Sequence, residues 1–215
     1  MKRVIALLAV LLPTTAAEQP NRLTPKERKE GYILLFNGKD LTGWEGDPAY
    51  WSVKDGAIVG STHPRPLKTS SFLVGKQEFS DFILKVDLKL LSSNSGVQFR
   101  STAQPEWQMT GYQADASDVG PKSAWGNLYE MNGRGRGIMK STDEGWLKAR
   151  EVVRTGDWNQ YEILAVGKHI QLKLNGIVTI DMEDDKSARG LFGVQLHPGP
   201  GMEVQLRNIK LKVLR

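Results

Sequence analysis

Polar side chains that could bind or act on a ligand recur on one face of three predicted strands. They alternate with apolar residues, and they are Gln98 and Arg100, Gln113 and Asp115, and Gln195 and His197. Side chains of a strand alternate between its two faces, so each pair is predicted to share the face opposite the core. Amides, guanidinium groups and carboxylates form hydrogen bonds in several directions, which suits a polyhydroxylated ligand. The pattern therefore favours a carbohydrate site.

Three titratable residues in or near these strands are candidate acids and bases. Asp115 and Glu130 could form the carboxylate pair that serves as a general acid and base, or as a base and a metal ligand. Histidine is the usual acid–base side chain at neutral pH, so His197 could act as a base or as a metal ligand. We therefore take Asp115, Glu130 and His197 as candidate catalytic residues, although strand alternation leaves open whether Tyr129 or Glu130 faces the ligand.

The sequence leaves open whether the protein binds a metal cofactor. A divalent metal is compatible with these side chains, but the chain has neither His-x-x-x-His spacing nor an acidic calcium-binding loop. The sequence therefore names no metal ligand.

Several of these residues have a plainer interpretation. The segment Asn94-Ser95-Gly96 is also typical of a turn, and Arg100 is equally compatible with an ion pair that covers the sheet. Trp125 could stack on a pyranose ring or pack in the core. With those alternatives open, the candidate substrate-binding residues are Asn94, Gln98, Arg100, Gln113, Trp125, Tyr129 and Gln195.

Short strands separated by turn signals predict an all-β, single-domain jelly-roll β-sandwich. Asp55-Gly56 and Asn175-Gly176 are typical hairpin turns, and residues 82–90 alternate through one long strand. No helical periodicity of useful length is visible. The last strand changes its apolar phase at Arg207-Asn208, as a β-bulge does, which predicts a curved sheet with a concave polar face.

The first residues have the features of an export signal. Lys2 and Arg3 precede a short apolar run, and the small residues Thr15-Ala16-Ala17 follow. We expect a signal peptide over residues 1–17, a linker over 18–30 and one domain over 31–215. The mature protein is then periplasmic or extracellular, with no membrane segment after cleavage, and the sequence leaves its oligomeric state open.

Composition narrows the possible partners and chemistry. The chain has no Cys, so it uses neither disulfides nor thiolates. Its net charge of +5 is scattered rather than gathered in a patch, which argues against nucleic-acid binding. The expected partner is a carbohydrate.

Several motifs together resemble the bacterial 3-keto-disaccharide hydrolase family. They include Leu35-Phe36-Asn37-Gly38-Lys39-Asp40-Leu41-Thr42-Gly43-Trp44, Asn94-Ser95-Gly96, Gly111-Tyr112-Gln113-Ala114-Asp115, Leu128-Tyr129-Glu130 and Gln195-Leu196-His197. The family more often has Glu-x-Gln after Gly-Tyr. Here Gln113 and Asp115 stand in those places, which moves the carboxylate by two residues on the same face.

The resemblance implies a concanavalin-like jelly roll in an exported protein that cleaves glycosides whose C3 hydroxyl has been oxidised to a ketone. The expected chemistry is abstraction of the C2 proton, elimination of the C1 substituent and addition of water. The alternative is a non-catalytic carbohydrate-binding module with the same fold. Three titratable groups near one face favour the enzyme, because binding alone needs no base.

Overall fold

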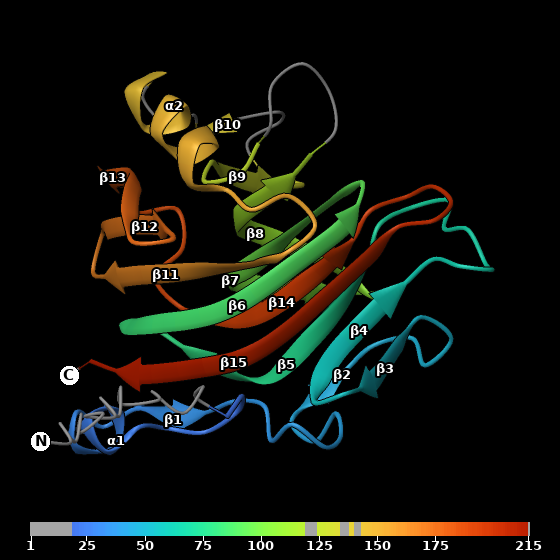
Figure 1. Ribbon diagram of the computed structural model, residues 1–215. Coiled ribbons are helices and arrows are strands. Elements are labelled where there is room, and N and C mark those ends of the chain that lie inside the picture. Colours follow the sequence, from blue (N-terminus) through green and yellow to red (C-terminus); the bar gives the residue numbers. More distant parts are fainter. Residues whose placement is uncertain (1–18, 119–123, 134–137, 140–142, 215) are drawn as a thin grey trace, which may run out of the picture.

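The computed structural model describes residues 19–118, 124–133, 138–139 and 143–214, so the predicted signal peptide lies outside the described residues. These residues form two antiparallel sheets packed face to face (Figure 1). Sheet A has the order β13 (Ile177–Glu183), β12 (His169–Leu174), β11 (Trp158–Val166), β6 (Phe82–Ser92), β15 (Glu203–Val213), β4 (Ala57–Ser61) and β3 (Trp51–Lys54), with β1 (Ile33–Leu34) paired to β15. Sheet B has the order β10 (Ile138–Met139), β9 (Leu128–Met131), β8 (Gln108–Ser117), β7 (Asn94–Gln104), β14 (Gly190–Leu196), β5 (Ser71–Phe79) and β2 (Trp44–Glu45). The predicted all-β jelly-roll sandwich is confirmed.

One hydrophobic core fills the space between the sheets. Strand β6 of sheet A buries every second residue from Phe82 to Leu90, whereas strands β7, β8 and β14 of sheet B are buried over consecutive residues. Phe82 meets Phe192 of β14 edge to face, with ring centroids 4.8 Å apart, and Phe79 stacks on Phe192 at 5.3 Å. Aromatic pairs at such distances stabilise a core beyond the area that they bury.

The predicted hairpin turns form as expected. Asp55 and Gly56 have φ angles of 50° and 73°, and Asn175 and Gly176 have 47° and 86°. Two successive positive φ angles match the right-handed twist of the flanking strands, and Asn-Gly and Asp-Gly adopt them readily. The first turn joins β3 to β4, and the second joins β12 to β13.

The predicted bulge in the last strand is confirmed. The pairing of β15 with β6 shifts between Arg207 and Lys210, and Asn208 has a φ of 53°. The side chain of Asn208 donates to Asp87 Oδ2 (2.6 Å), and Asn208 also exchanges two hydrogen bonds with Asn21. The bulge thereby attaches the N-terminal segment to sheet A.

Helix α1 (Pro25–Lys29) lies in the segment that we predicted as a linker. Thr24 and Glu27 form a capping box, and Glu27 pairs with Lys210 of β15 at 2.8 Å. Residues 19–30 therefore lie against sheet A.

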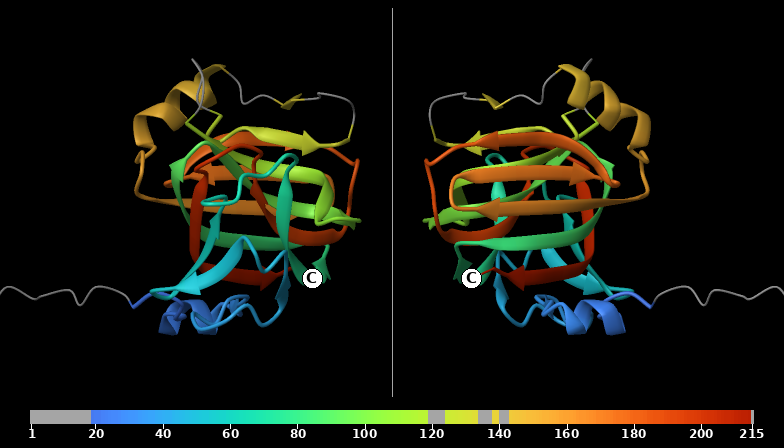
Figure 2. Two further views of the ribbon diagram at one scale, coloured as in Figure 1. Left: turned by 90° about the vertical axis from the view of Figure 1, so that its right-hand side faces the viewer. Right: turned by 90° about the vertical axis from the view of Figure 1, so that its left-hand side faces the viewer.

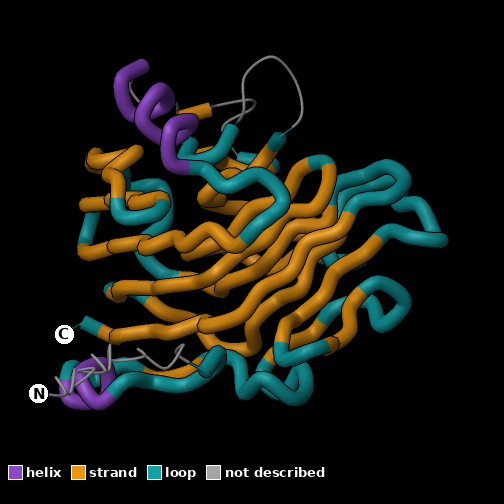
Figure 3. Tube along the Cα trace, in the orientation of Figure 1, coloured by secondary structure: helices purple, strands orange, loops and turns teal. Residues whose placement is uncertain are grey.

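Helix α2 (Asp143–Val152) was not predicted, so the expectation of no useful helix is wrong there. It contacts β13 and lies at the opposite end of the molecule from α1 (Figures 2 and 3). Ala149 is the one fully buried residue among its described side chains, so the apolar stripe that marks a helix in sequence is weak. Neither helix in the described residues is long and apolar enough to cross a bilayer.

Close packing in the β3–β4 hairpin gives a test of the fold. A Cβ at Gly60 would lie 2.4 Å from the ring of Trp51, which is buried and directly opposite on β3. Gly60→Ala should therefore lower the free energy of unfolding by about 1–3 kcal/mol in a denaturant titration. Gly75→Ala is the matched control, since its Cβ would meet nothing closer than 3.5 Å. Equal stability of the two variants would contradict this packing.

Candidate functional site

A pocket of about 410 Å³ opens on the face of sheet B that points away from sheet A. Six of the predicted site residues line it, from β7, β8, β9 and the end of β14: Asn94, Gln113, Asp115, Tyr129, Gln195 and His197. Ser70, Met131 and Pro198 complete the wall, and sequence reasoning missed them. Met131 lies on β9 two residues after Tyr129 and so shares its face, whereas Ser70 and Pro198 lie in loops.

The amides form a hydrogen-bonded chain along the floor of the pocket. Gln98 Nε2 donates to Gln113 Oε1 (2.7 Å), and Gln113 Nε2 donates to Asp115 Oδ1 (2.9 Å) and Gln195 Oε1 (3.1 Å). Gln195 Nε2 in turn donates to Ser70 Oγ (3.1 Å). The three glutamines therefore share one face, as predicted. Because each amide has a fixed partner, its oxygen and nitrogen cannot exchange places without breaking the chain.

Gly96 makes room for this arrangement. It lies directly opposite Asp115 on the neighbouring strand, and a Cβ there would be 2.5 Å from Cγ of Gln113. Ser95, on the other face, donates its hydroxyl to the backbone oxygen of Gln195 (2.8 Å). The segment from Asn94 to Gly96 thus begins strand β7 and is not itself a turn.

Asp115 is the most perturbed acid of the pocket. Its side chain is buried, with 9% of the residue exposed. Burial raises the pKa of Asp115 to about 7, against the opposing effect of hydrogen bonds from Gln113 and the backbone of Ala116. From inside the core, the hydroxyl of Tyr161 on β11 donates to the backbone oxygen of Asp115 and accepts from the Gly126 amide at 2.8 Å. Sheet A therefore fixes the strand that carries Asp115.

The imidazole of His197 has a defined hydrogen-bond partner. Its Nδ1 lies 3.0 Å from the backbone oxygen of Pro198. A carbonyl oxygen only accepts, so Nδ1 carries the hydrogen, and Nε2 of the neutral ring is the nitrogen that can take a proton. Within the described residues, neither the hydroxyl of Tyr129 nor the amide of Asn94 has a side-chain hydrogen bond, which leaves both available to a ligand.

Gln98 lies beneath the pocket rather than in its wall. The side chain is fully buried, and its Oε1 accepts from Ser101 Oγ at 2.7 Å. It therefore supports Gln113 and does not reach a ligand itself.

Arg100 does not face the pocket, so the expectation that Gln98 and Arg100 share a face is wrong. Pairing of β7 with β8 shifts between Phe99 and Thr102, and Arg100 has a φ of 46°, which breaks the alternation. The buried guanidinium pairs with Asp81 (3.0 Å) and donates to the backbone oxygens of Ser80 (2.8 Å) and Gly167 (2.7 Å). The alternative of a structural ion pair is the one that forms.

Trp125 and Glu130 also lie away from the pocket. Trp125 is buried and stacks on Tyr161, with centroids 6.1 Å apart and planes 14° apart, so packing is its role. On β9, Tyr129 pairs with Gln113 and faces the pocket, whereas Glu130 pairs with the core residue Tyr112 on the other face. Asp115 and Glu130 therefore do not form a carboxylate pair across the pocket.

No cluster of three or more His, Asp or Glu side chains that could hold a metal ion occurs in the described part of the chain. The pocket itself brings together one carboxylate, Asp115, and one imidazole, His197. That pair is short of the three protein ligands that catalytic zinc sites use.

Several solved structures share this β-sandwich fold. A candidate glycosyl hydrolase from Parabacteroides distasonis has 25% sequence identity and a TM-score of 0.70, covering 92% of this chain and 100% of its own. A carbohydrate-binding module from Bacillus subtilis has 16% identity and a TM-score of 0.59, covering 81% and 98%. A protein of unknown function with a galectin-like fold, also from Bacillus subtilis, has 12% identity and a TM-score of 0.60, covering 81% and 92%.

The last two likenesses show the fold alone.

A family model described as a 3-keto-alpha-glucoside-1,2-lyase-like domain matches residues 31–212, so the chain belongs to this family. The resemblance seen in the sequence is thereby confirmed. A comparison with curated proteins found no match.

The buried carboxylate should make stability depend on pH. The pKa of Asp115 is raised in the folded state, so its contribution is full below about pH 4 and is lost as pH rises through about 7. Asp115→Asn keeps an acceptor for Gln113 and removes the charge. The melting temperature of the variant should match that of the parent at pH 4 and exceed it at pH 8. At pH 8 its free energy of unfolding should be higher by up to about 4 kcal/mol. A variant less stable than the parent at pH 8 would contradict this placement.

Proposed function

We propose that the pocket of Asp115 binds a glycoside whose C3 carries a ketone and that Asp115 removes the C2 proton. One observation carries the proposal: a buried carboxylate with a pKa of about 7 lies in a pocket lined with amides. A general base works best when its pKa lies near the working pH, because it is then both ionised and basic enough to accept a proton.

The chemistry follows from the ketone. A carbonyl at C3 makes the C2 hydrogen acidic, so the carboxylate of Asp115 can take it and leave an enolate. The electron pair then forms the C1–C2 double bond, and the bond from C1 to the aglycone oxygen breaks. Water next adds its oxygen to C1, and C2 regains a proton from Asp115. The net reaction is hydrolysis, with no glycosyl-enzyme intermediate.

The remaining lining residues can hold the substrate and supply the proton that the departing oxygen needs. The hydroxyl of Tyr129, or Nε2 of His197 once the ring is protonated, can protonate the departing oxygen, and both line the pocket. The same group regains its proton from the water molecule that adds to C1. The unpaired amide of Asn94 and the remaining N–H of Gln195 can donate to sugar hydroxyls or to the enolate oxygen. Gln113 holds Asp115 in place through the bond at 2.9 Å.

The comparisons with known proteins support the proposed cleavage of 3-keto-glycosides. The family description names a 1,2-lyase acting on 3-keto-α-glucosides, which matches elimination across C1 and C2. The Parabacteroides relative is described as a candidate glycosyl hydrolase. Together with the predicted signal peptide, these observations favour an exported enzyme that works on glycosides in the periplasm or outside the cell.

A non-catalytic carbohydrate-binding module is the second candidate. The shared fold with the Bacillus subtilis module favours it, because that protein is described as carbohydrate-binding. Such a module needs hydrogen-bonding groups but no desolvated base, so Asp115 separates the two functions. Saturable binding of 3-keto-glycosides without turnover would favour the module.

Turnover is the direct test. The protein should release glucose from 3-keto-trehalose, and assays with and without a chelator show whether a metal takes part. Asp115→Asn should lower kcat by about 10²–10⁴-fold while the fold is retained, because the amide keeps the shape and loses the proton acceptor. Asp55→Asn, in the exposed β3–β4 turn, controls for loss of a carboxylate. Near-native kcat in Asp115→Asn would exclude Asp115 as the base.

The pH dependence of kcat/KM tests the same residue without removing it. Activity should rise with pH as Asp115 ionises, with an apparent pKa near 7 in the free enzyme. The hydrogen bond from Gln113 stabilises the carboxylate, so Gln113→Met should move this limb to higher pH by about one unit. An unchanged limb in Gln113→Met would assign the titration to another group.

A further inference from the structure

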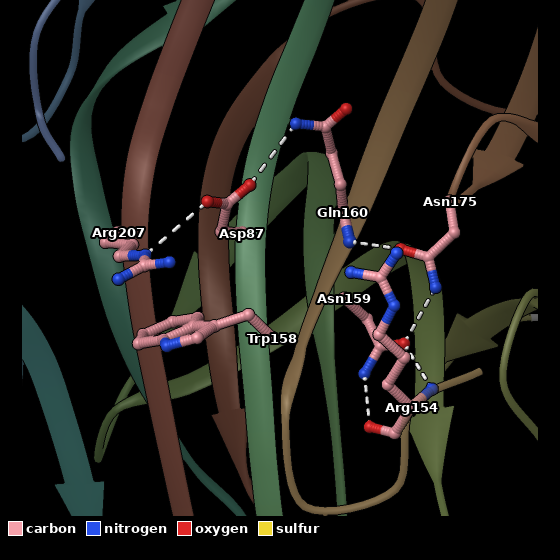
Figure 4. A pocket seen from close by; sticks show the side chains of 7 residues that line it. All are labelled: Asp87, Arg154, Trp158, Asn159, Gln160, Asn175 and Arg207. Carbon is pink, nitrogen blue, oxygen red and sulfur yellow. Dashed lines mark hydrogen bonds and ion pairs between the residues drawn. The ribbon is translucent and has the colours of Figure 1, made fainter. Parts of the chain in front are cut away.

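A second pocket, of about 370 Å³, lies on the opposite side of the sandwich from Asp115. Figure 4 shows the side chains that line it. It is on the outer face of sheet A, where Asp87 and Gln160 alternate with core residues of β6 and β11. Its lining residues are Asp87, Arg154, Trp158, Asn159, Gln160, Asn175 and Arg207. Four separate segments of the chain meet here, and the proposed function uses none of them.

The two asparagines of this pocket are engaged in holding the backbone. Asn159 accepts from the backbone nitrogen of Arg154 (2.8 Å) and donates to its oxygen (2.9 Å). Asn175 accepts from the backbone nitrogen of Gln160 and donates to Val152 and Asn159. They build the wall, and their polar atoms are not available to a ligand.

Arg207 is held in place without using the end of its guanidinium. The group stacks on Trp158, with Cζ 4.1 Å from the ring centroid, and Nε lies 3.5 Å from Asp87 Oδ2. Within the described residues, neither terminal nitrogen has a hydrogen bond or ion pair. A stacked guanidinium loses less conformational entropy on binding, and its two terminal nitrogens match the two oxygens of a carboxylate.

Arg154 contributes a second cation. Its backbone is fixed by Asn159, while its exposed guanidinium has no ion pair in the part of the chain that the structure describes. The lining therefore contains two arginines and one carboxylate, Asp87, which already accepts from Asn208 (2.6 Å) and Gln160 (3.3 Å). The lining carries an excess of positive charge.

We propose that this pocket binds an acidic saccharide, with its carboxylate on Arg207 and Arg154. The volume of about 370 Å³ exceeds what a small inorganic anion fills and suits a sugar ring. Gln160 keeps its amide oxygen for a hydroxyl group, and the indole of Trp158 supplies apolar surface beside the stacked arginine. This second site attaches the protein to an anionic polysaccharide while the pocket of Asp115 on the other face stays open.

The probe is a matched pair of ligands, trigalacturonate and its methyl ester, which share every ring and differ in charge. Calorimetric titration of the full protein at low ionic strength should show the acid binding at least about tenfold more tightly than the ester. Arg154→Gln and Arg207→Gln should each weaken binding of the acid by about tenfold or more. Arg154 is exposed, so its variant tests the site even if loss of the Arg207 stack disturbs folding.

Two control variants distinguish binding at this pocket from diffuse charge attraction and from binding at the pocket of Asp115. Arg189→Gln removes an exposed arginine elsewhere and should change the affinity less than about twofold. Asp115→Asn should bind the acid as the parent does, so failure of the first pocket and failure of the second are distinguishable.

Three outcomes would overturn the proposal. Equal binding of the acid and its methyl ester would show that the arginines do not recognise the carboxylate. An equal loss in Arg189→Gln would show diffuse charge attraction. Equal affinity for sodium sulfate and trigalacturonate would show a simple anion site rather than a saccharide site.

Discussion

The hydrogen bond from Gln113 to the buried carboxylate of Asp115 is the contact on which the pocket depends. It ties an ionisable group to a chain of amides whose orientations are all fixed by their neighbours. Burial raises the pKa of that group, while the hydrogen bond limits the rise, so the two effects together set the value near neutral pH. Gly96 is part of the same constraint, because any side chain there would displace Gln113.

Keeping such a group in the fold opposes stability. A carboxylate that must be desolvated when ionised weakens the folded state at the pH where it can act as a base. The surrounding core offsets this cost. Tyr161 reaches from sheet A to the backbone of Asp115, and Trp125 stacks on Tyr161, so the strand with the unfavourable charge is held by rigid aromatic packing. Residues that never meet a ligand are therefore needed for the site.

Most of the fold prediction rested on the alternation of apolar and polar residues along the strands. Hairpin turns at Gly56 and Gly176, the bulge at Asn208 and the shared face of Gln113, Asp115, Gln195 and His197 follow from local pattern. The errors have a local cause as well. A bulge at Arg100 reversed the face of that residue, and α2 has too weak an apolar stripe to be recognised. Neither feature changes composition or spacing in a way that the sequence makes visible.

The sequence by itself determined the class of fold, the family and the face on which Gln98, Gln113, Asp115 and Gln195 lie, because strand alternation is a property of the backbone. Only the tertiary structure decided which polar residues meet a ligand. Tyr129 and Glu130 are neighbours with equal claims until cross-strand register places one beside Gln113 and the other beside the core. The pKa of Asp115 and the ion pair of Arg207 with Asp87 were likewise invisible in sequence, since burial and pairing arise from residues far away along the chain.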